Sequence, residues 1–205
     1  THPNPVSVNG QITQRGAGVI GLVGVSPNGP TVPTLISNDV EAADYGPSIF
    51  DGRTIPHALD AILAQGSAQV LVINVFVAAT HNTAVTAEAN TVPADLIVEL
   101  PHIPYAGPVM KDTTGVTTLV SGTDYTWEEN TNRITILNTT DYGSGISIKA
   151  AYTWFDTSKV LAAHIVGGNT SGVRTGASLL ELAYSDFGLL PIILIAPGFS
   201  QTAAF

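Results

Sequence analysis

Apolar runs and helix-period segments alternate over the first 81 residues. Residues 18–25 form a run rich in valine and isoleucine that stops at a Ser-Pro-Asn-Gly-Pro turn, which predicts a buried strand. Residues 35–36 predict a short extended segment. A polar residue at 37, 38 or 39 then caps a predicted short helix that ends near Tyr45.

A clearer helix and a second strand follow. Thr54 precedes a segment with an apolar residue every three or four positions, and Gly66 provides a stop, which predicts a helix between them. Residues 70–77 are almost continuously apolar. Such a run is typical of a strand covered on both faces, as in a parallel sheet under helices.

The pattern changes to β structure between residues 81 and 156, where alternation, turn residues and threonine dominate. Residues 95–100 predict a strand before a proline-rich break at 101–108. Residues 123–128 and 133–137 predict the two strands of a hairpin. Residues 146–154 alternate as a half-buried strand does, with an apolar face formed by Ile146, Ile148, Ala150, Tyr152 and Trp154.

Helical patterns return after residue 156. Asp156 or Thr157 caps a predicted helix that ends at glycines 167–168, and a second predicted helix covers residues 175–186. Residues 192–196 predict a fully apolar strand.

An α/β pattern that is interrupted by a β block and then resumes predicts one domain inserted in another. The predicted host is a discontinuous α/β domain of residues 1–81 and 157–205. The predicted insert is an all-β domain of residues 82–156, built as a sandwich or barrel. The fold class is therefore α/β, with α+β character.

Composition narrows the function. Only 11% of the residues are charged, so an unusually large share of the surface is uncharged, as in chains that pack against other subunits. A soluble monomer rich in Thr, Asn, Ser and Gly would show the same composition. The net charge of −9 and the scattered Lys and Arg residues argue against a nucleic-acid partner.

Features that the sequence lacks argue against a disulfide-bonded, membrane-spanning or secreted protein. The chain has no cysteine, which excludes disulfides and thiolate metal sites. No apolar run approaches the ~20 residues of a membrane-spanning helix, and the first residues do not resemble a signal peptide.

A glycine motif invites a cofactor hypothesis. Residues 16–21 match the Gly-x-Gly-x-x-Gly pattern of dinucleotide-binding proteins, with Asp39 and Glu41 downstream. That chemistry needs a helix to begin at the glycines, whereas Pro27 and Pro30 follow too soon. We therefore expect a glycine-rich strand and no cofactor.

The histidines and acidic residues show no catalytic or metal-binding pattern. The five histidines are not closely paired and fall in different predicted segments: His2, His57, His81, His102 and His164. His57 and Asp60 have the spacing of a surface pair on a helix. We expect no catalytic residue, no metal site and no enzyme activity.

Two loops remain as weaker candidates for a small-molecule site. Residues 167–172 predict a flexible glycine-rich loop, and residues 196–200 follow the carboxyl end of a predicted strand, where open α/β sheets often bind ligands. Simple connections between elements would have the same composition. Asn138 and Asn169 match the glycosylation pattern, which has no consequence without secretion.

The order of these segments resembles contractile phage tail sheath proteins. The segments that resemble the family's start are residues 18–24, 34–37, 45–46 and 70–77. Those that resemble its inserted β domain and the return into its core are residues 122–126, 133–135, 152–159, 167–168, 174–176 and 193–200. Sheath proteins normally continue past the last of these segments, so we expect a fragment that lacks the C-terminal part and carries only part of the sheath core.

The resemblance implies a structural subunit of the virion, made in the host bacterial cytoplasm. Its implied partners are other copies of itself in stacked rings and a helical sheath, the tail tube protein, and the baseplate and tail terminator proteins. Terminal arms would add strands to neighbouring sheets, and contraction would be a rigid-body rearrangement. Without those arms, we expect the 205-residue chain to fold but to form no tubes by itself.

Two other functions remain open from the sequence. The β block could be a receptor- or carbohydrate-binding module that uses the aromatic residues Tyr125, Trp127, Tyr152 and Trp154. The alternation predicts instead that these rings are buried. A nucleotide-dependent enzyme would use the glycine motif, and its ligand would raise thermal stability.

Overall fold

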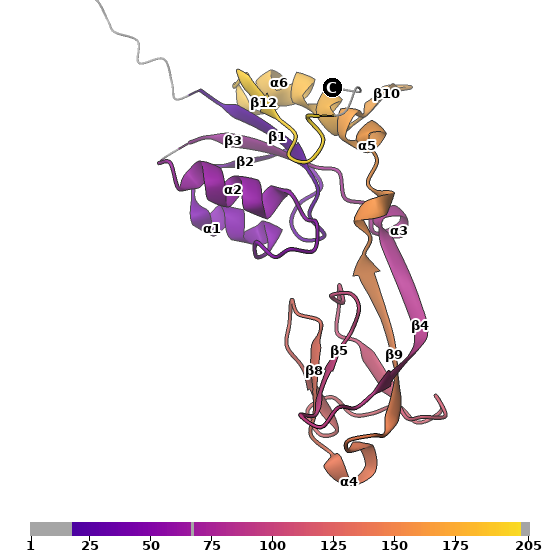
Figure 1. Ribbon diagram of the computed structural model, residues 1–205. Coiled ribbons are helices and arrows are strands. Elements are labelled where there is room, and N and C mark those ends of the chain that lie inside the picture. Colours follow the sequence, from indigo (N-terminus) through magenta and orange to yellow (C-terminus); the bar gives the residue numbers. More distant parts are fainter. Residues whose placement is uncertain (1–17, 67, 202–205) are drawn as a thin grey trace, which may run out of the picture.

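The computed structural model describes residues 18–66 and 68–201, which form two parts (Figure 1). We call residues 18–81 and 156–201 the α/β part, and residues 82–155 the distal lobe. Helices and strands mix in the α/β part, whereas strands dominate the distal lobe. The chain therefore has a mixed α/β structure of the α+β kind.

A four-stranded sheet, counted over the described residues, forms the centre of the α/β part, in the order β12-β1-β3-β2. Its strands are β1 (Ile20–Gly24), β2 (Thr34–Ile36), β3 (Val70–Asn74) and β12 (Ile193–Ile195). β1 pairs in parallel with both β3 and β12, and β2 is antiparallel to β3. All of β3 is buried, as its continuous apolar sequence predicts.

Helices cover both faces of this sheet (Figure 1). Leu22, Val70 and Val72 pack on the side of α1 (Asp39–Ala42), η1 (Ala43–Tyr45) and α2 (Ile55–Leu63). Val23 and Ile73 face the opposite side. The elements there are α5 (Ala162–Val166), η3 (Gly176–Leu182) and α6 (Ala183–Phe187).

The predicted helix starts are confirmed, with one difference in chemistry. Asn38 is the N-cap of α1, and its side chain accepts a hydrogen bond from Glu41 N. Thr54 precedes α2, but its hydroxyl instead accepts a hydrogen bond from Val25 N at 3.0 Å. Thr54 therefore ties α2 to the end of β1, because the approach of strand and helix gives that hydroxyl a tertiary partner.

Within the described residues, the distal lobe holds two three-stranded antiparallel sheets. The first has the order β4-β9-β6, from β4 (Asn82–Thr91), β9 (Ser147–Phe155) and β6 (Val109–Lys111). The second has the order β5-β8-β7, from β5 (Ile97–Glu99), β8 (Arg133–Ile136) and β7 (Tyr125–Trp127). A short helix, α4 (Thr139–Tyr142), joins β8 to β9. The hairpin predicted from residues 123–137 is confirmed as β7 and β8.

The distal lobe has its own apolar core, whose buried members all lie between Val92 and Tyr152. Ile148, Ala150 and Tyr152 are buried on β9, as the alternation predicts. The alternation ends at Phe155, which is buried in the core of the α/β part. β9 thus contributes side chains to the cores of both parts.

The chain crosses between the two parts at neighbouring points. α3 (Ala78–His81) leads into β4, and η2 (Thr157–Lys159) follows β9. Asn82 pairs with Phe155 in the sheet, and Asp156 N donates to His81 O at 2.8 Å. The ring of Phe76 lies 5.9 Å, between centroids, from that of Phe155 and 5.9 Å from that of Tyr105 of the distal lobe.

The structure corrects the sequence prediction for residues 156–168. The predicted single helix is two short ones, η2 and α5, separated by extended backbone at Val160 and Leu161. Asp156 does cap the first by accepting from Ser158 N. The break places His164 so that its ring accepts a hydrogen bond from Leu161 N.

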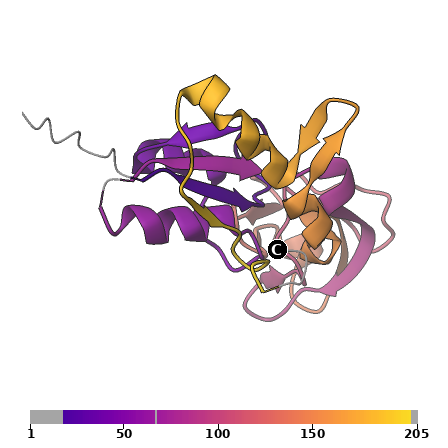
Figure 2. The same ribbon diagram turned by 90° about the horizontal axis from the view of Figure 1, so that it is seen from above.

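Residues 167–172 are not the predicted flexible loop. They belong to a hairpin of β10 (Gly168–Thr170) and β11 (Val173–Thr175), whose turn has positive φ at Ser171 and Gly172. Figure 2 shows this hairpin projecting from the α/β part. The helix predicted over 175–186 follows, but its first half is the 3₁₀ helix η3.

Two predicted strands also differ from the observed ones. The strand predicted over 70–77 ends at Asn74, whose side chain accepts hydrogen bonds from Ser26 N at 3.0 Å and Phe76 N at 3.2 Å. His81, where the sequence pattern turned to β structure, is the last residue of helix α3. The strand predicted as fully apolar at 192–196 is β12, at the edge of the sheet and largely exposed.

Candidate interaction surface and lobe junction

An exposed apolar surface lies along the β12 edge of the sheet. We call it the apolar edge, and its members are Leu190 (62% exposed), Ile192 (74%), Ile193 (51%) and Leu194 (50%), on β12 and the segment before it. β12 pairs with β1 on one side and has no partner strand on the other among the described residues. An unpaired edge beside exposed apolar side chains is a surface on which another chain can pair and pack.

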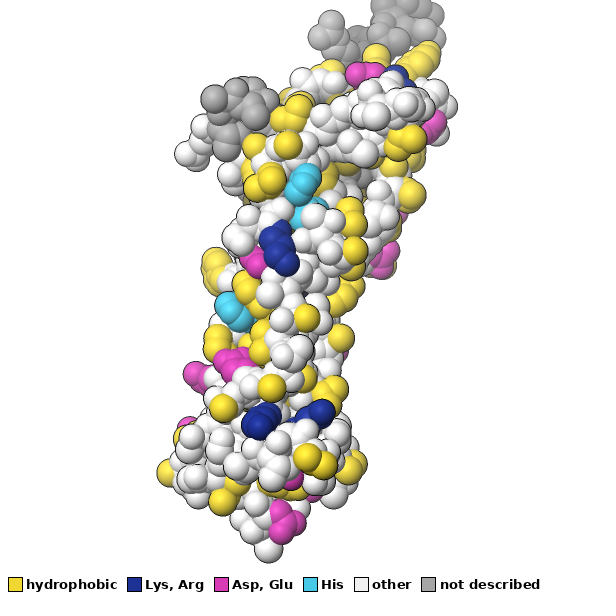
Figure 3. All heavy atoms as spheres, turned by 90° about the vertical axis from the view of Figure 1, so that its right-hand side faces the viewer, with side chains coloured by type: hydrophobic (Ala, Val, Ile, Leu, Met, Phe, Trp, Pro, Cys, Tyr) yellow, Lys and Arg dark blue, Asp and Glu magenta, His cyan; other side chains and the backbone are white. Residues whose placement is uncertain are grey.

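Charge is sparse on the surface. On the face drawn in Figure 3, lysine, arginine and acidic side chains are scattered among uncharged ones. Ion pairs in the described part of the chain include Arg174 with Glu181, at 2.9 Å between Nη2 and Oε2, and the exposed pair of Arg133 and Glu99. The small share of charged residues in the sequence therefore leaves much of this face uncharged.

One ion pair is buried, and sequence reasoning missed it. Arg53 is 5% exposed, and its guanidinium pairs with Asp51, 2.6 Å between Nη2 and Oδ2. Its Nη1 also donates to Asn28 Oδ1 at 3.3 Å. The pair fixes the loop before α2, which lies close to the distal lobe: Arg53 and Asp51 line a small hollow with Tyr105 and Trp127. Only the tertiary structure distinguishes this arginine from the exposed ones.

The structure also joins two histidines that the sequence left apart. His81 Nε2 lies 3.0 Å from His164 Nδ1, although the residues are 83 positions apart. His81 is 1% exposed. Burial, together with the charge that His164 would carry, lowers the pKa of His81 below its usual value. The spacing of the histidines in the sequence gives no sign of this contact.

The histidine pair lines a cavity of about 360 Å³ beyond the carboxyl end of β3. Other lining residues include Phe76, Leu179 and Arg174. This is the position at which open α/β sheets often hold ligands, and the volume falls within the range of ligand pockets, roughly 300–1,000 Å³. The sequence instead suggested residues 167–172 and 196–200 for such a site, and neither segment lines the cavity.

The other candidates from the sequence lie apart from one another. His57 Nε2 contacts Ile49 O at 3.0 Å, while Asp60 accepts a hydrogen bond from Ser48 Oγ. The predicted His57–Asp60 surface pair thus gives way to contacts with the preceding loop. His102 stacks on Trp154 with ring centroids 3.6 Å apart.

The described residues include the glycine motif only from Gly18 onward, because Gly16 and Ala17 lie outside them. His2 lies outside them too. β1 starts at Ile20, and the chain runs from β1 through a turn to β2 without an intervening helix. A Cβ at Gly21 would approach Leu180 and Pro191 at 3.2 Å. This glycine therefore lets η3 and the segment before β12 pack closely on the sheet, and the predicted glycine-rich strand is confirmed.

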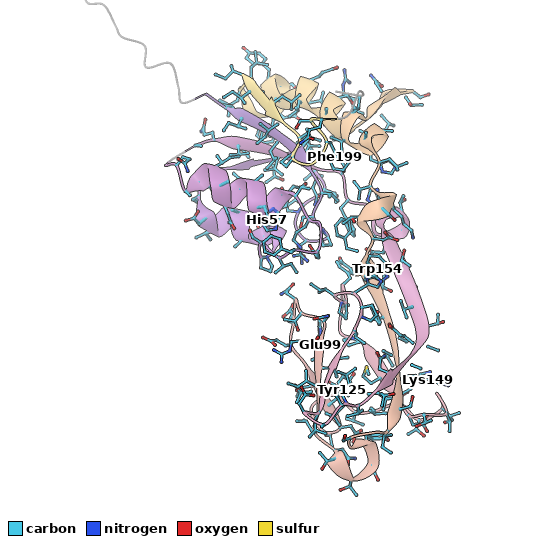
Figure 4. All side chains as sticks on the ribbon, viewed as in Figure 1. His57, Glu99, Tyr125, Lys149, Trp154 and Phe199 are labelled. Carbon is cyan, nitrogen blue, oxygen red and sulfur yellow. The ribbon has the colours of Figure 1, made fainter. Side chains whose placement is uncertain are left out.

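The four aromatic residues that the sequence offered as a binding surface are largely covered. Tyr125 is 5% exposed and Tyr152 is 6% exposed, and Trp127 and Trp154 are half-buried against the same core. Tyr125 Oη donates to Pro108 O at 2.7 Å. Figure 4 shows Tyr125 inside the lobe and Trp154 at the upper end of β9. The burial predicted from the alternation is confirmed for the two tyrosines.

Two further searches bear on function. Among the described residues, no three His, Asp or Glu side chains gather closely enough to hold a metal ion. No helix in that part of the chain has the length and apolar character needed to cross a membrane.

The described residues thus define an α/β protein with a β-rich lobe and an unpaired apolar sheet edge. No protein-family model matches the chain. A search of curated proteins found a tail sheath protein of Burkholderia phage BcepMu, 41% identical over 189 residues, which cover 88% of this chain and 39% of the relative. The chain is a homologue of part of a phage tail sheath protein, and the resemblance seen in the sequence is confirmed.

Proposed function

We propose that this chain is part of the subunit of a contractile phage tail sheath, a structural protein of the virion. The observation that carries the proposal is the 41% identity to a tail sheath protein over 88% of the chain. Because the chain spans about two-fifths of that relative's length, at 39%, the role of the whole protein is inferred through the relative.

In this proposal the subunit packs against other copies of itself in rings stacked around a tail tube. The sparse charge, 11% of residues, supports extensive subunit contact, because the centres of protein interfaces are depleted in charged residues. The apolar edge along β12 supports it too. In the parent protein, further sheath residues or a neighbouring subunit would cover this edge.

The proposal divides the chain into a discontinuous host domain, residues 1–81 and 157–205, and an inserted β domain, residues 82–156. The separate apolar core of the distal lobe and the adjacent crossing points support that division. An insert whose ends lie side by side leaves the host fold intact.

Contraction would then be a rearrangement of these rigid units between two packings, with no catalytic step. Its partners in the tail would be the tube, the baseplate and the terminator proteins. The subunit would be made in the host cytoplasm and assembled there.

A chimera tests the proposed function. This chain would replace the matching segment of the Burkholderia phage sheath protein, in a phage whose own sheath gene is silenced. We expect negative-stain electron microscopy to show tails with a sheath. A matched control chimera carries Ile193→Asp and Leu194→Asp on the apolar edge and should give bare tubes.

A soluble, folded chimera that leaves every tail without a sheath would contradict the proposal. A sheath formed equally well by the Asp-substituted control would contradict the role of the apolar edge alone.

The alternative of a receptor- or carbohydrate-binding module depended on exposed aromatic rings. Tyr125 and Tyr152 are buried, and Trp154 is stacked against His102. This burial leaves the alternative without its main support, and we do not favour it.

A further inference from the structure

The His81–His164 pair lies at the junction of the two parts of the molecule. His81 ends α3, immediately before β4 enters the distal lobe, and its carbonyl oxygen accepts a hydrogen bond from Asp156 N, where β9 returns. His164 lies in α5, in the chain that follows this return. The contact between the rings therefore links the outgoing and returning segments.

Backbone donors determine which nitrogen of each ring carries the proton. Val77 N donates to His81 Nδ1 at 3.0 Å. Because that nitrogen accepts through its lone pair, it carries no proton, and the proton of the neutral ring is on Nε2. His81 Nε2–H then donates to His164 Nδ1. Leu161 N donates to the same His164 nitrogen at 3.2 Å, so the proton of His164 is on its own Nε2.

Neither ring can gain a proton without losing these contacts. A proton added to His81 would go to Nδ1, opposite the N–H of Val77. A proton added to His164 would go to its Nδ1, opposite the donors of His81 and Leu161. Two donors facing each other repel, so the network is complete only when both rings are neutral.

We propose that the His81–His164 pair is a pH-sensitive latch at the lobe junction, which holds α3 and α5 together while both rings are neutral and releases them on acidification. The outgoing and returning segments of the chain are then held together at the lobe junction above about pH 6.5, the usual pKa of histidine. Below that pH the junction loosens, while the cores of the two parts stay intact.

The lowered pKa of His81 agrees with a latch that opens on acidification. An unfolded chain takes up this proton near pH 6.5, whereas the folded chain resists it. The stability contributed by the neutral pair is therefore full above the unfolded pKa and is lost as pH falls through the folded one.

Charged groups on the neighbouring elements are already engaged. Asp156 accepts hydrogen bonds from Thr83 and Ser158, which lower its pKa, and Lys159 on η2 donates to Asn82 O at 2.6 Å. Arg174 on β11 lines the same cavity and is paired with Glu181 of η3. The partners of these groups are side chains or carbonyl groups other than the two rings, so the contact between the rings stands apart from them.

The network also argues against a metal ion between the rings. A metal on His81 Nε2 requires the proton of that ring to be on Nδ1, where Val77 N–H already donates. The short contact between the rings is accordingly a hydrogen bond, and the device responds to protons.

Native-state hydrogen exchange by NMR on the 205-residue chain tests the latch, because the amides of Val77 and Leu161 donate directly to the two rings. We expect their protection, corrected for the intrinsic rate, to fall several-fold between pH 7.5 and pH 5, because a protonated ring cannot accept the hydrogen bond of either amide. The amide of Val92, bonded to Ile146 O within the distal lobe, should change by less than about twofold. Imidazole nitrogen shifts at pH 7.5 should show both rings protonated on Nε2.

Two variants sharpen the test. His164→Asn keeps an acceptor near the position of Nδ1 that cannot be protonated, so the fall at Leu161 should disappear. His57→Gln removes a histidine of α2 away from the junction and should keep the wild-type fall. Protection of Val77 and Leu161 that does not depend on pH, or a His81 proton on Nδ1 at pH 7.5, would overturn the proposal. These wild-type measurements decide the matter even if His164→Asn fails to fold.

Discussion

At the scale of single residues, a β-bulge determines which side chain of β4 reaches the distal core. Val85 pairs with Tyr152 and Glu88 pairs with Ala150. Two residues of β4 between these pairs therefore lie opposite a single residue of β9, which is a β-bulge. Strict alternation from Val85 would turn Ala87 inward. The extra residue turns Glu88 inward instead, and its carboxylate accepts a hydrogen bond from Tyr152 Oη at 2.7 Å.

This bond predicts an effect of Tyr152→Phe. We expect a loss of roughly 1.5–3 kcal/mol in the free energy of unfolding, the usual value of a hydrogen bond to a charged group. Burial and the nearby Glu88 carboxylate raise the pKa of Tyr152, so its contribution is full below pH 10 and is lost as pH rises through the folded value. Urea unfolding at pH 8 and at pH 10–11 should show a smaller alkaline loss in the variant than in the wild type.

The matched control is Tyr184→Phe, because Tyr184 is 65% exposed. It should leave both the stability at pH 8 and the alkaline loss unchanged. Equal alkaline losses in Tyr152→Phe and the wild type would show that the Glu88 contact does not hold the phenol neutral.

At the scale of elements, β12 shows how an apolar strand differs from a buried one. The sequence predicts a fully apolar strand here, yet Ile193 and Leu194 are each about half exposed. The apolar sequence indicates that the strand is covered from water in the assembled protein. It does not indicate whether the residues that cover the strand belong to the same chain or to another one.

Charges placed beside this strand should reduce self-association with little effect on folding. Leu190→Lys and Ile192→Lys alter side chains that are 62% and 74% exposed, so each should change the free energy of unfolding by about 0.5 kcal/mol or less. Sedimentation velocity across a concentration series should show less association in the double variant. The control, Val116→Lys, alters an 81% exposed side chain of the distal lobe and should behave as the wild type does. Equal association in all three proteins would mean that the apolar edge is not the contact.

At the scale of the whole molecule, the distal lobe and the α/β part bury separate sets of apolar side chains, and the paired strands β4 and β9 connect the two parts. The buried members of the distal core lie within residues 92–152, and Phe155, at the end of β9, is buried in the other part. Each core is therefore formed largely by its own segment of the chain. The contact of Phe76 with Tyr105 of the distal lobe, and the burial of Phe155 of β9 in the α/β part, orient one part on the other.

The distal lobe should consequently fold when it is cut out. We expect residues 82–156, with Phe155→Ser to remove the ring that packs in the α/β part, to give a dispersed amide NMR spectrum and cooperative thermal unfolding. Antiparallel pairing of Asn82 with Phe155 brings the two ends together, so the cut leaves the sheet complete. Ile148→Ala in the same fragment should lower its stability by roughly 2–5 kcal/mol. Random-coil shifts in both fragments would show that the lobe depends on the α/β part.

The sequence alone determined the features that local chemistry controls. The β1 strand, a helix cap within residues 37–39, the β7–β8 hairpin and the alternation of β9 follow from periodicity, turn residues and capping within a few positions. The order of these segments was also sufficient to identify the resemblance to tail sheath proteins.

Only the tertiary structure decided the contacts between distant residues. The His81–His164 pair, the buried Arg53 and the exposed side of β12 depend on which segments meet in space, and no local pattern encodes that. The bulge that turns Glu88 inward changes strand register, which alternation read from one strand cannot reveal. Local propensities act over a few residues, whereas burial and hydrogen-bond partners are fixed when the whole chain packs.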